Sequence, residues 1–127
     1  MQRLFVATVL IANFLSVACG TELIDAHVFL DHSEPRVGAS LAAPPGVRIW
    51  FSGALEPAFS TLRVQDAAGK RVDNGDARVN PSDGTLLEIS VPPLPPGTYR
   101  VIWSVVAKDG HKAEGDFTFT VKERSSD

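Results

Sequence analysis

Cysteine is nearly absent from this chain of 127 residues, since Cys19 is the only one. A single cysteine excludes an internal disulfide and a metal cluster held by several thiolates. An excess of positive charge is also absent, because 12 Lys and Arg side chains are outnumbered by 15 Asp and Glu side chains and the net charge is −3. The composition therefore gives no reason to expect a nucleic-acid partner. The length allows one domain at most.

The first segment has the composition of a secretory signal peptide. Residues 1–3 are short and positively charged, and residues 4–18 are a nearly unbroken apolar run. This run is too short and too weakly flanked to predict a membrane-spanning helix. We therefore assign residues 1–26 to a cleaved signal peptide and residues 27–127 to the mature domain.

The position of the cleavage decides which residue begins the mature chain. Cleavage after Ala26 is the site that we expect, and it makes His27 the new N-terminus. The alternative is cleavage before Cys19, because residues 15–19 resemble a lipobox whose leucine lies one position too far upstream. A lipid anchor on Cys19 would leave His27 inside the chain. Export places the domain in an oxidising compartment, and residues 27–127 contain no thiol to oxidise.

The mature chain alternates polar and apolar residues over short stretches, and it has neither helical periodicity nor an internal repeat. Alternation of this kind, interrupted by Gly, Pro and Asn, predicts β-strands. The predicted strands span residues 28–34, 47–52, 61–66, 85–91, 99–107 and 113–122, with a short return at 70–72 and a short strand near Arg78. About seven short strands predict an all-β Greek-key sandwich, immunoglobulin-like in architecture, or a small barrel.

The remaining segments are assigned to loops or to the core. Residues 36–46, 56–60 and 92–97 are predicted connectors, and four prolines exclude the last of them from a central strand. Asp73, Asp76 and Asp83 lack the spacing of a calcium loop, so we interpret them as turn formers. The large aromatic residues of the strands are assigned to core packing: Trp50, Phe51, Trp103, Phe117 and Phe119.

The last two strands form a predicted hairpin whose loop carries Asp109, Gly110 and His111. Asp-Gly is a hairpin-turn signal, and a loop histidine taken alone has no further meaning. A mature N-terminus at His27 changes this interpretation, because its α-amine and its imidazole can bind one metal ion together. The pKa of an α-amine is only about 8, so a metal ion readily displaces its proton.

Asp109 and His111 complete a possible metal site with His27. One residue separates Asp109 from His111, so an extended or gently turned backbone directs both side chains to the same side. The three residues together offer three nitrogens and one oxygen, a set that Cu(II) prefers in a tetragonal plane. Zn²⁺ accepts the same atoms tetrahedrally, so the ligand types alone leave the metal open between the two ions.

With these residues in view, the mature chain resembles the CopC family of periplasmic copper-binding proteins. The resemblance covers nearly all of residues 27–121. It is carried by His27-Val28-Phe29-Leu30, Ser33-Glu34-Pro35, Leu55-Glu56-Pro57-Ala58-Phe59-Ser60, Gly97-Thr98-Tyr99-Arg100-Val101-Ile102-Trp103, Asp109-Gly110-His111 and Gly115-Asp116-Phe117-Thr118-Phe119. The combination of an N-terminal His with a later Asp-x-His is far more specific than either motif alone.

The resemblance implies a cupredoxin-like fold and a function in copper resistance or uptake. It places His27, Asp109 and His111 on the Cu(II) ligands of the family, and it implies a periplasmic monomer with a CopD-like inner-membrane protein as its partner. Some members also carry a methionine-rich Cu(I) site. Here the only methionine is Met1, which leaves with the signal peptide. We therefore expect a protein that binds Cu(II) alone.

Two further residues are weaker candidates for the metal site. His32 lies five positions from His27, which on a strand places it on the opposite face, so we expect an edge or supporting residue and not a ligand. Glu56 belongs to the matching segment before Ser60. It either accepts a hydrogen bond from the N-terminal amine or is a solvated loop carboxylate, and the sequence leaves both interpretations open.

Three functions from different classes are compatible with these residues. The first is a periplasmic copper carrier or buffer. This is the function that we expect, and a protein of this kind is not an enzyme. The second is a copper monooxygenase with a histidine brace; Asp109 and His111 would fill the coordination plane that such an enzyme leaves open, and the chain has few loop aromatics. The third is a metal-free immunoglobulin-like interaction module in which Asp109-Gly110-His111 is only a turn.

Overall fold

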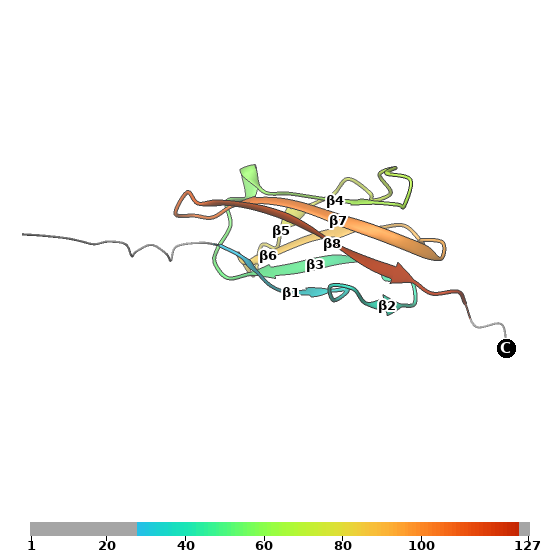
Figure 1. Ribbon diagram of the computed structural model, residues 1–127. Coiled ribbons are helices and arrows are strands. Elements are labelled where there is room, and N and C mark those ends of the chain that lie inside the picture. The colour runs from blue at the N-terminus through green and yellow to red at the C-terminus, as the bar shows by residue number, and fades with distance from the viewer. Residues whose placement is uncertain (1–27, 125–127) are drawn as a thin grey trace, which may run out of the picture.

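The computed structural model describes residues 28–124, which form a sandwich of two four-stranded sheets (Figure 1). The first sheet has the order β1 (Leu30–Glu34), β3 (Gly46–Phe51), β6 (Leu86–Ser90) and β5 (Arg78–Val79). The second sheet has the order β2 (Ser40–Leu41), β8 (Lys112–Val121), β7 (Gly97–Val106) and β4 (Thr61–Gln65). The predicted all-β sandwich is confirmed, with two separate sheets in place of a closed barrel.

The core lies between the two sheets and is made by every second residue of the long strands. On β7, the residues from Tyr99 to Val105 alternate between buried and solvent-facing positions, and Phe117, Phe119 and Val121 of β8 are buried opposite them. This alternation follows from the pleat, which directs successive side chains to opposite faces. The core assignment is confirmed for Trp103, Phe117 and Phe119.

The assignment of Trp50 to the core is wrong. Val47, Ile49 and Phe51 of β3 are buried, so the residues between them must face outward. Trp50 is only half-buried, and its ring stacks on His32 of β1 with 4.4 Å between ring centroids. The guanidinium carbon of Arg48 lies 5.0 Å from the centroid of the Trp50 ring. A large aromatic residue here covers the outer face of the sheet.

The predicted loop at residues 36–46 contains a strand that the sequence pattern did not show. β2 pairs in parallel with the far end of β8, Ser40 with Thr120 and Leu41 with Val121. The backbone N–H of Gly38 also donates to the carbonyl of Thr118, with 2.7 Å between nitrogen and oxygen. Two residues are too short for an alternation to be recognised. This segment carries the chain from the first sheet to the second and back.

The other connections agree with the sequence or add local detail. The connector at residues 56–60 contains a short 3₁₀ helix, η1 (Pro57–Phe59). The return near residue 71 is an isolated bridge from Gln65 to Arg71, and the short strand near Arg78 is β5. No helix among residues 28–124 is long and apolar enough to cross a membrane.

The predicted turn formers are confirmed for Asp73 and Asp83, whose carboxylates bond the backbone two residues on, whereas Asp76 bonds Ser90 at the end of β6. Asp73 accepts the amide of Gly75, with 2.8 Å between nitrogen and oxygen, and Asp83 accepts the amide of Thr85 at 3.0 Å. The Asp76 carboxylate accepts hydrogen bonds from both the amide and the hydroxyl of Ser90. These carboxylates therefore hold loop backbone in place.

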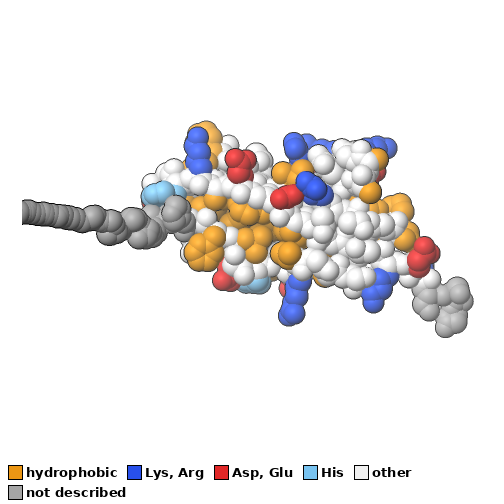
Figure 2. Space-filling view, viewed as in Figure 1, with side chains coloured by type: hydrophobic (Ala, Val, Ile, Leu, Met, Phe, Trp, Pro, Cys, Tyr) orange, Lys and Arg blue, Asp and Glu red, His pale blue; other side chains and the backbone are white. Residues whose placement is uncertain are grey.

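Hydrophobic side chains reach the surface where β8 faces β1 across the opening between the sheets (Figure 2). Leu30 of β1 and Ala113 of β8 are only partly buried against the core, and 57% of Phe29 is exposed. The described residues therefore leave apolar surface exposed along this side of the sandwich.

Candidate metal centre

The tip of the β7–β8 hairpin carries the two candidate ligands that the structure describes. The strands pair without interruption from Gly97 opposite Val121 to Val106 opposite Lys112. The loop then closes with hydrogen bonds from the Ala107 amide to the His111 carbonyl and from the Gly110 amide to the Ala107 carbonyl, both 2.8 Å from nitrogen to oxygen. Gly110 adopts a φ of +93°, a conformation that favours glycine. The predicted Asp-Gly turn is confirmed.

The hairpin brings the side chains of Asp109 and His111 into direct contact. The Oδ1 atom of Asp109 lies 3.0 Å from the Nδ1 atom of His111, and the same oxygen accepts the His111 backbone N–H at 3.1 Å. Both side chains are about half-exposed, 56% for Asp109 and 47% for His111. The prediction that they point to one side of the loop is confirmed.

The electrostatics of the loop favour an ionised carboxylate at Asp109. The backbone N–H of His111, and after it the His111 side chain, lower the pKa of the Asp109 carboxyl below its ordinary value. An ionised, half-exposed carboxylate next to an imidazole can bind a divalent cation without first losing a proton. The Asp109 carboxyl is therefore ionised at neutral pH, as an oxygen ligand for a cation must be.

The third predicted ligand, His27, lies outside the described residues. Its neighbour Val28 is buried and lines a small hollow of about 290 Å³ together with Ala107, Lys108 and Asp109. Within residues 28–124, no group of three or more His, Cys, Asp or Glu side chains could hold a metal ion. The described part of the chain therefore contains two of the predicted ligands, with the start of the described chain beside them.

Residues 54–60 lie alongside the base of this loop. Leu55 forms an isolated bridge with Ala107, and the Lys108 amide donates to the Ala54 carbonyl at 2.9 Å. The Lys108 ammonium lies 3.6 Å from a carboxylate oxygen of Glu56. Glu56 is therefore adjacent to the candidate site, whereas any contact with the amine of His27 falls outside the described residues.

His32 is not near Asp109 or His111. It lies on the outer face of the first sheet, stacked on Trp50, and its Nδ1 atom is 2.7 Å from Oδ2 of Asp31. His32 and Asp31 thus form a second exposed Asp–His pair, which lies on a strand and not at a loop tip. The expectation that His32 is an edge residue agrees with this position.

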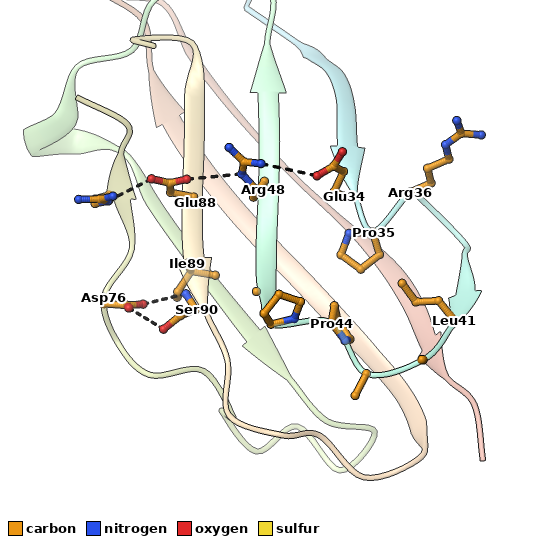
Figure 3. A pocket seen from close by; sticks show the side chains of 15 residues that line it. Glu34, Pro35, Arg36, Leu41, Pro44, Arg48, Asp76, Glu88, Ile89 and Ser90 are labelled. Carbon is orange, nitrogen blue, oxygen red and sulfur yellow. Dashed lines mark hydrogen bonds and ion pairs between the residues drawn. The ribbon is translucent and has the colours of Figure 1, made fainter. Parts of the chain in front are cut away.

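A larger hollow of about 900 Å³ lies near β2, toward the end of β8 opposite the hairpin loop (Figure 3). Its apolar part includes Leu41, Pro44 and Ile89. Beside it, ion pairs cross all four strands of the first sheet, in the order Glu34, Arg48, Glu88 and Arg78. None of the described residues that line it is His, Met or Cys. This hollow therefore offers copper no imidazole, thioether or thiolate ligand.

Known proteins share both the sequence pattern and the fold of this chain. Residues 30–122 match the family model of the CopC domain. The chain belongs to the CopC family. It is 34% identical to protein YobA of Escherichia coli strain K12 over 110 residues, a match that covers 85% of this chain and 89% of YobA.

Solved structures of the CopC family have the same fold. CopC from Methylosinus trichosporium OB3b is 35% identical and has a TM-score of 0.73, over 79% of this chain and 98% of that protein. PcoC from Escherichia coli, a methionine-rich copper resistance protein, is 36% identical with a TM-score of 0.66, over 76% of this chain and all of PcoC. This CopC chain differs from PcoC in composition, because Met1 is its only methionine.

Proposed function

We propose that the mature protein is a periplasmic carrier or buffer that holds one Cu(II) at the hairpin end of the sandwich. The ligands are the α-amine and imidazole of His27, the carboxylate of Asp109 and the imidazole of His111. The observation that carries the proposal is the 3.0 Å contact between Asp109 and His111 at a loop tip that shares a hollow with Val28. Membership of the CopC family supports copper as the cargo.

The position of Val28 supports a contribution from His27. Val28 is buried, and the next residue is held by a hydrogen bond from the Phe29 amide to the Ser52 hydroxyl at 3.0 Å. Consecutive Cα atoms are about 3.8 Å apart, so the Cα of His27 lies one peptide unit from an anchored residue beside Asp109. A free amine at His27 would therefore be tethered within reach of the loop.

The donor atoms favour Cu(II) over Cu(I). Amine, imidazole and carboxylate groups suit Cu(II), whereas thioethers and thiolates select Cu(I). Residues 27–127 contain neither methionine nor cysteine. A protein of this composition holds copper as Cu(II), and the ion can be released without a change in the oxidation state of the copper.

Carriage fits this site better than catalysis. Four donor atoms from His27, Asp109 and His111 fill a tetragonal plane and leave no position in it for a reacting oxygen molecule. The exposure of Asp109 and His111 suits exchange of the ion with another protein. We propose a CopD-like inner-membrane protein as that partner, with the mature domain acting as a monomer.

Mass spectrometry of the exported protein, combined with a copper titration, tests the proposal directly. We expect a mature chain that starts at His27 and binds one Cu(II), with an EPR spectrum of tetragonal nitrogen and oxygen coordination. A mature chain that starts at Cys19 with a lipid attached would contradict the site, because His27 would then have no free amine.

Adding one glycine before His27 tests the N-terminal amine separately from the imidazole. The nitrogen of His27 becomes an amide, which must be deprotonated at high cost before it binds a metal. We expect Cu(II) affinity, measured by chelator competition, to fall by orders of magnitude while the far-UV CD spectrum stays unchanged. Native affinity in the extended protein would remove His27 from the ligand set.

His111→Ala tests the loop ligand, and His32→Ala is its matched control. Both histidines are about half-exposed and each lies next to a carboxylate, but only His111 is at the hairpin tip. We expect His111→Ala to weaken Cu(II) binding strongly and His32→Ala to leave it unchanged. Equal losses in the two variants would show that copper binds exposed histidines without a defined site.

A further inference from the structure

Ser33 and Ser60 are the polar residues that are buried as whole residues among residues 28–124, and they make different kinds of contact. The hydroxyl of Ser33 donates to the carbonyl of Pro35, two residues away, with 2.7 Å between the oxygens. The hydroxyl of Ser60 instead connects segments that are far apart in the sequence. A buried hydroxyl normally has hydrogen-bond partners, and those of Ser60 are at the base of the candidate metal loop.

Ser60 stands where β4 stops pairing with β7. The ladder between these strands ends at Thr61 opposite Ser104, because the preceding residues turn away into η1. The amide of Val106 is therefore left without a backbone acceptor on this side. It donates instead to the hydroxyl of Ser60 at 3.3 Å, and that hydroxyl donates in turn to the carbonyl of Glu56 at 2.9 Å.

The same short segment then continues along the hairpin toward the candidate ligands. The Glu56 amide donates to the Val106 carbonyl at 2.7 Å, so both backbone groups of Val106 are held from one side. The bridge between Leu55 and Ala107 and the hydrogen bond from the Lys108 amide follow directly. Val106 is the last residue of β7, three positions before Asp109.

We propose that Ser60 is a positioning residue for the copper site, an inference that rests on the proposed function. Its hydroxyl extends the β4–β7 ladder past the point where the backbone of β4 leaves, and it thereby fixes the base of the loop that carries Asp109 and His111. Ser60 does not contact the metal. Its hydroxyl holds Val106, and the loop backbone that follows Val106 then fixes the positions of Asp109 and His111 relative to each other.

Removal of the hydroxyl should loosen the loop without removing a ligand. In Ser60→Ala, the Val106 N–H has no acceptor and the Glu56 carbonyl loses one of its two donors, since the Phe59 amide remains at 3.2 Å. Loss of a group that supports a metal ligand typically lowers metal affinity by about 10–100-fold. Because Ser60 acts through the backbone, we expect a loss near the lower end, about tenfold, and a broadened Cu(II) EPR signal.

Two variants separate positioning from a general loss of stability. Ser60→Thr keeps the hydroxyl, and Ser60 borders a hollow of about 540 Å³ that can accept the added methyl group. Ser33→Ala removes the other buried serine hydroxyl, near the end of β1 where the chain leaves for β2. We expect Ser60→Thr to retain the wild-type EPR signal and Cu(II) dissociation rate. Ser33→Ala should lower the melting temperature and leave both copper measurements unchanged.

Amide hydrogen exchange of the metal-free proteins supplies a measurement that does not depend on copper. Ser60→Ala should exchange faster than wild type at Val106 and at residues 107–111, and Ser33→Ala should not. Wild-type exchange and wild-type EPR in Ser60→Ala would overturn the positioning role, as would an equal EPR change in Ser33→Ala. A wild-type protein that binds no Cu(II) would instead refute the metal site itself, and the positioning proposal with it.

Discussion

Substitution of Gly115 by alanine should destabilise the sandwich, because the added methyl group would clash with the indole ring of Trp103. The two residues are paired across β7 and β8. A Cβ atom on Gly115 would lie 2.6 Å from Cζ2, 3.1 Å from Cε2 and 3.2 Å from Cη2 of that ring. The backbone of Gly115 is not in the left-handed region, so the expected effect is steric and does not come from its φ angle.

Trp103 is packed against the core, so a shift of its ring away from the added methyl group would disturb that packing. Trp103 is 8% exposed, and its indole meets the ring of Phe51 edge to face, with 5.1 Å between centroids. Overpacking of a core costs about 1–3 kcal/mol, and three close contacts on a rigid ring point to about 2–3 kcal/mol. For a domain of this size, 1 kcal/mol shifts the melting temperature by about 4–8 °C, so we expect a decrease of about 10–20 °C.

The assay is thermal and urea unfolding followed by CD, with Gly53→Ala as the matched control. A Cβ on Gly53 has nothing within 4 Å, so the same chemical change there should leave stability nearly unaltered. In a Trp103→Phe background the smaller ring should reduce the cost of Gly115→Ala, which gives a measurable coupling between the two sites. A melting temperature for Gly115→Ala within about 2 °C of Gly53→Ala would refute the steric argument.

Three further outcomes are expected. Burial opposes ionisation of Asp73, but hydrogen bonds from the Arg71 side chain and from the amides of Val64 and Gly75 outweigh this effect and lower the pKa of the Asp73 carboxyl. The ionised carboxylate therefore stabilises the fold above the ordinary Asp pKa of about 3.9, and this stability is lost as the pH falls through the lowered pKa of the folded protein. Asp73→Asn should therefore flatten the decline of unfolding free energy in urea titrations below about pH 4, and an unchanged pH dependence would contradict this. Cu(I) should bind far more weakly than Cu(II) in competition titrations, since comparable affinities would require sulfur ligands that the mature chain lacks. Asp109→Ala should weaken Cu(II) binding less than His111→Ala, because water can replace a carboxylate oxygen; the reverse order in chelator competition would assign the larger role to the carboxylate.

Local patterns were sufficient to predict the long strands and the hairpin. Alternation in β7 and β8 identifies the inward residues because the pleat acts on neighbouring positions. The Asp-Gly turn and the contact of Asp109 with His111 follow from a separation of one residue. Trp50 faces outward in agreement with the alternation of β3, so its position in the strand, and not its size, determines its burial.

Contacts between distant segments required the folded chain. β2 is a strand only because β8 offers its edge, and its two residues carry no pattern of their own. Whether His27 completes the site remains a prediction, since that residue lies outside the described range. Ser60 is the clearest case: it is separated from Val106 by 46 positions, and the sequence segment that contains it does not predict this contact. Its role arises because the backbone of β4 turns away at η1 and leaves an amide that only a neighbouring hydroxyl can satisfy.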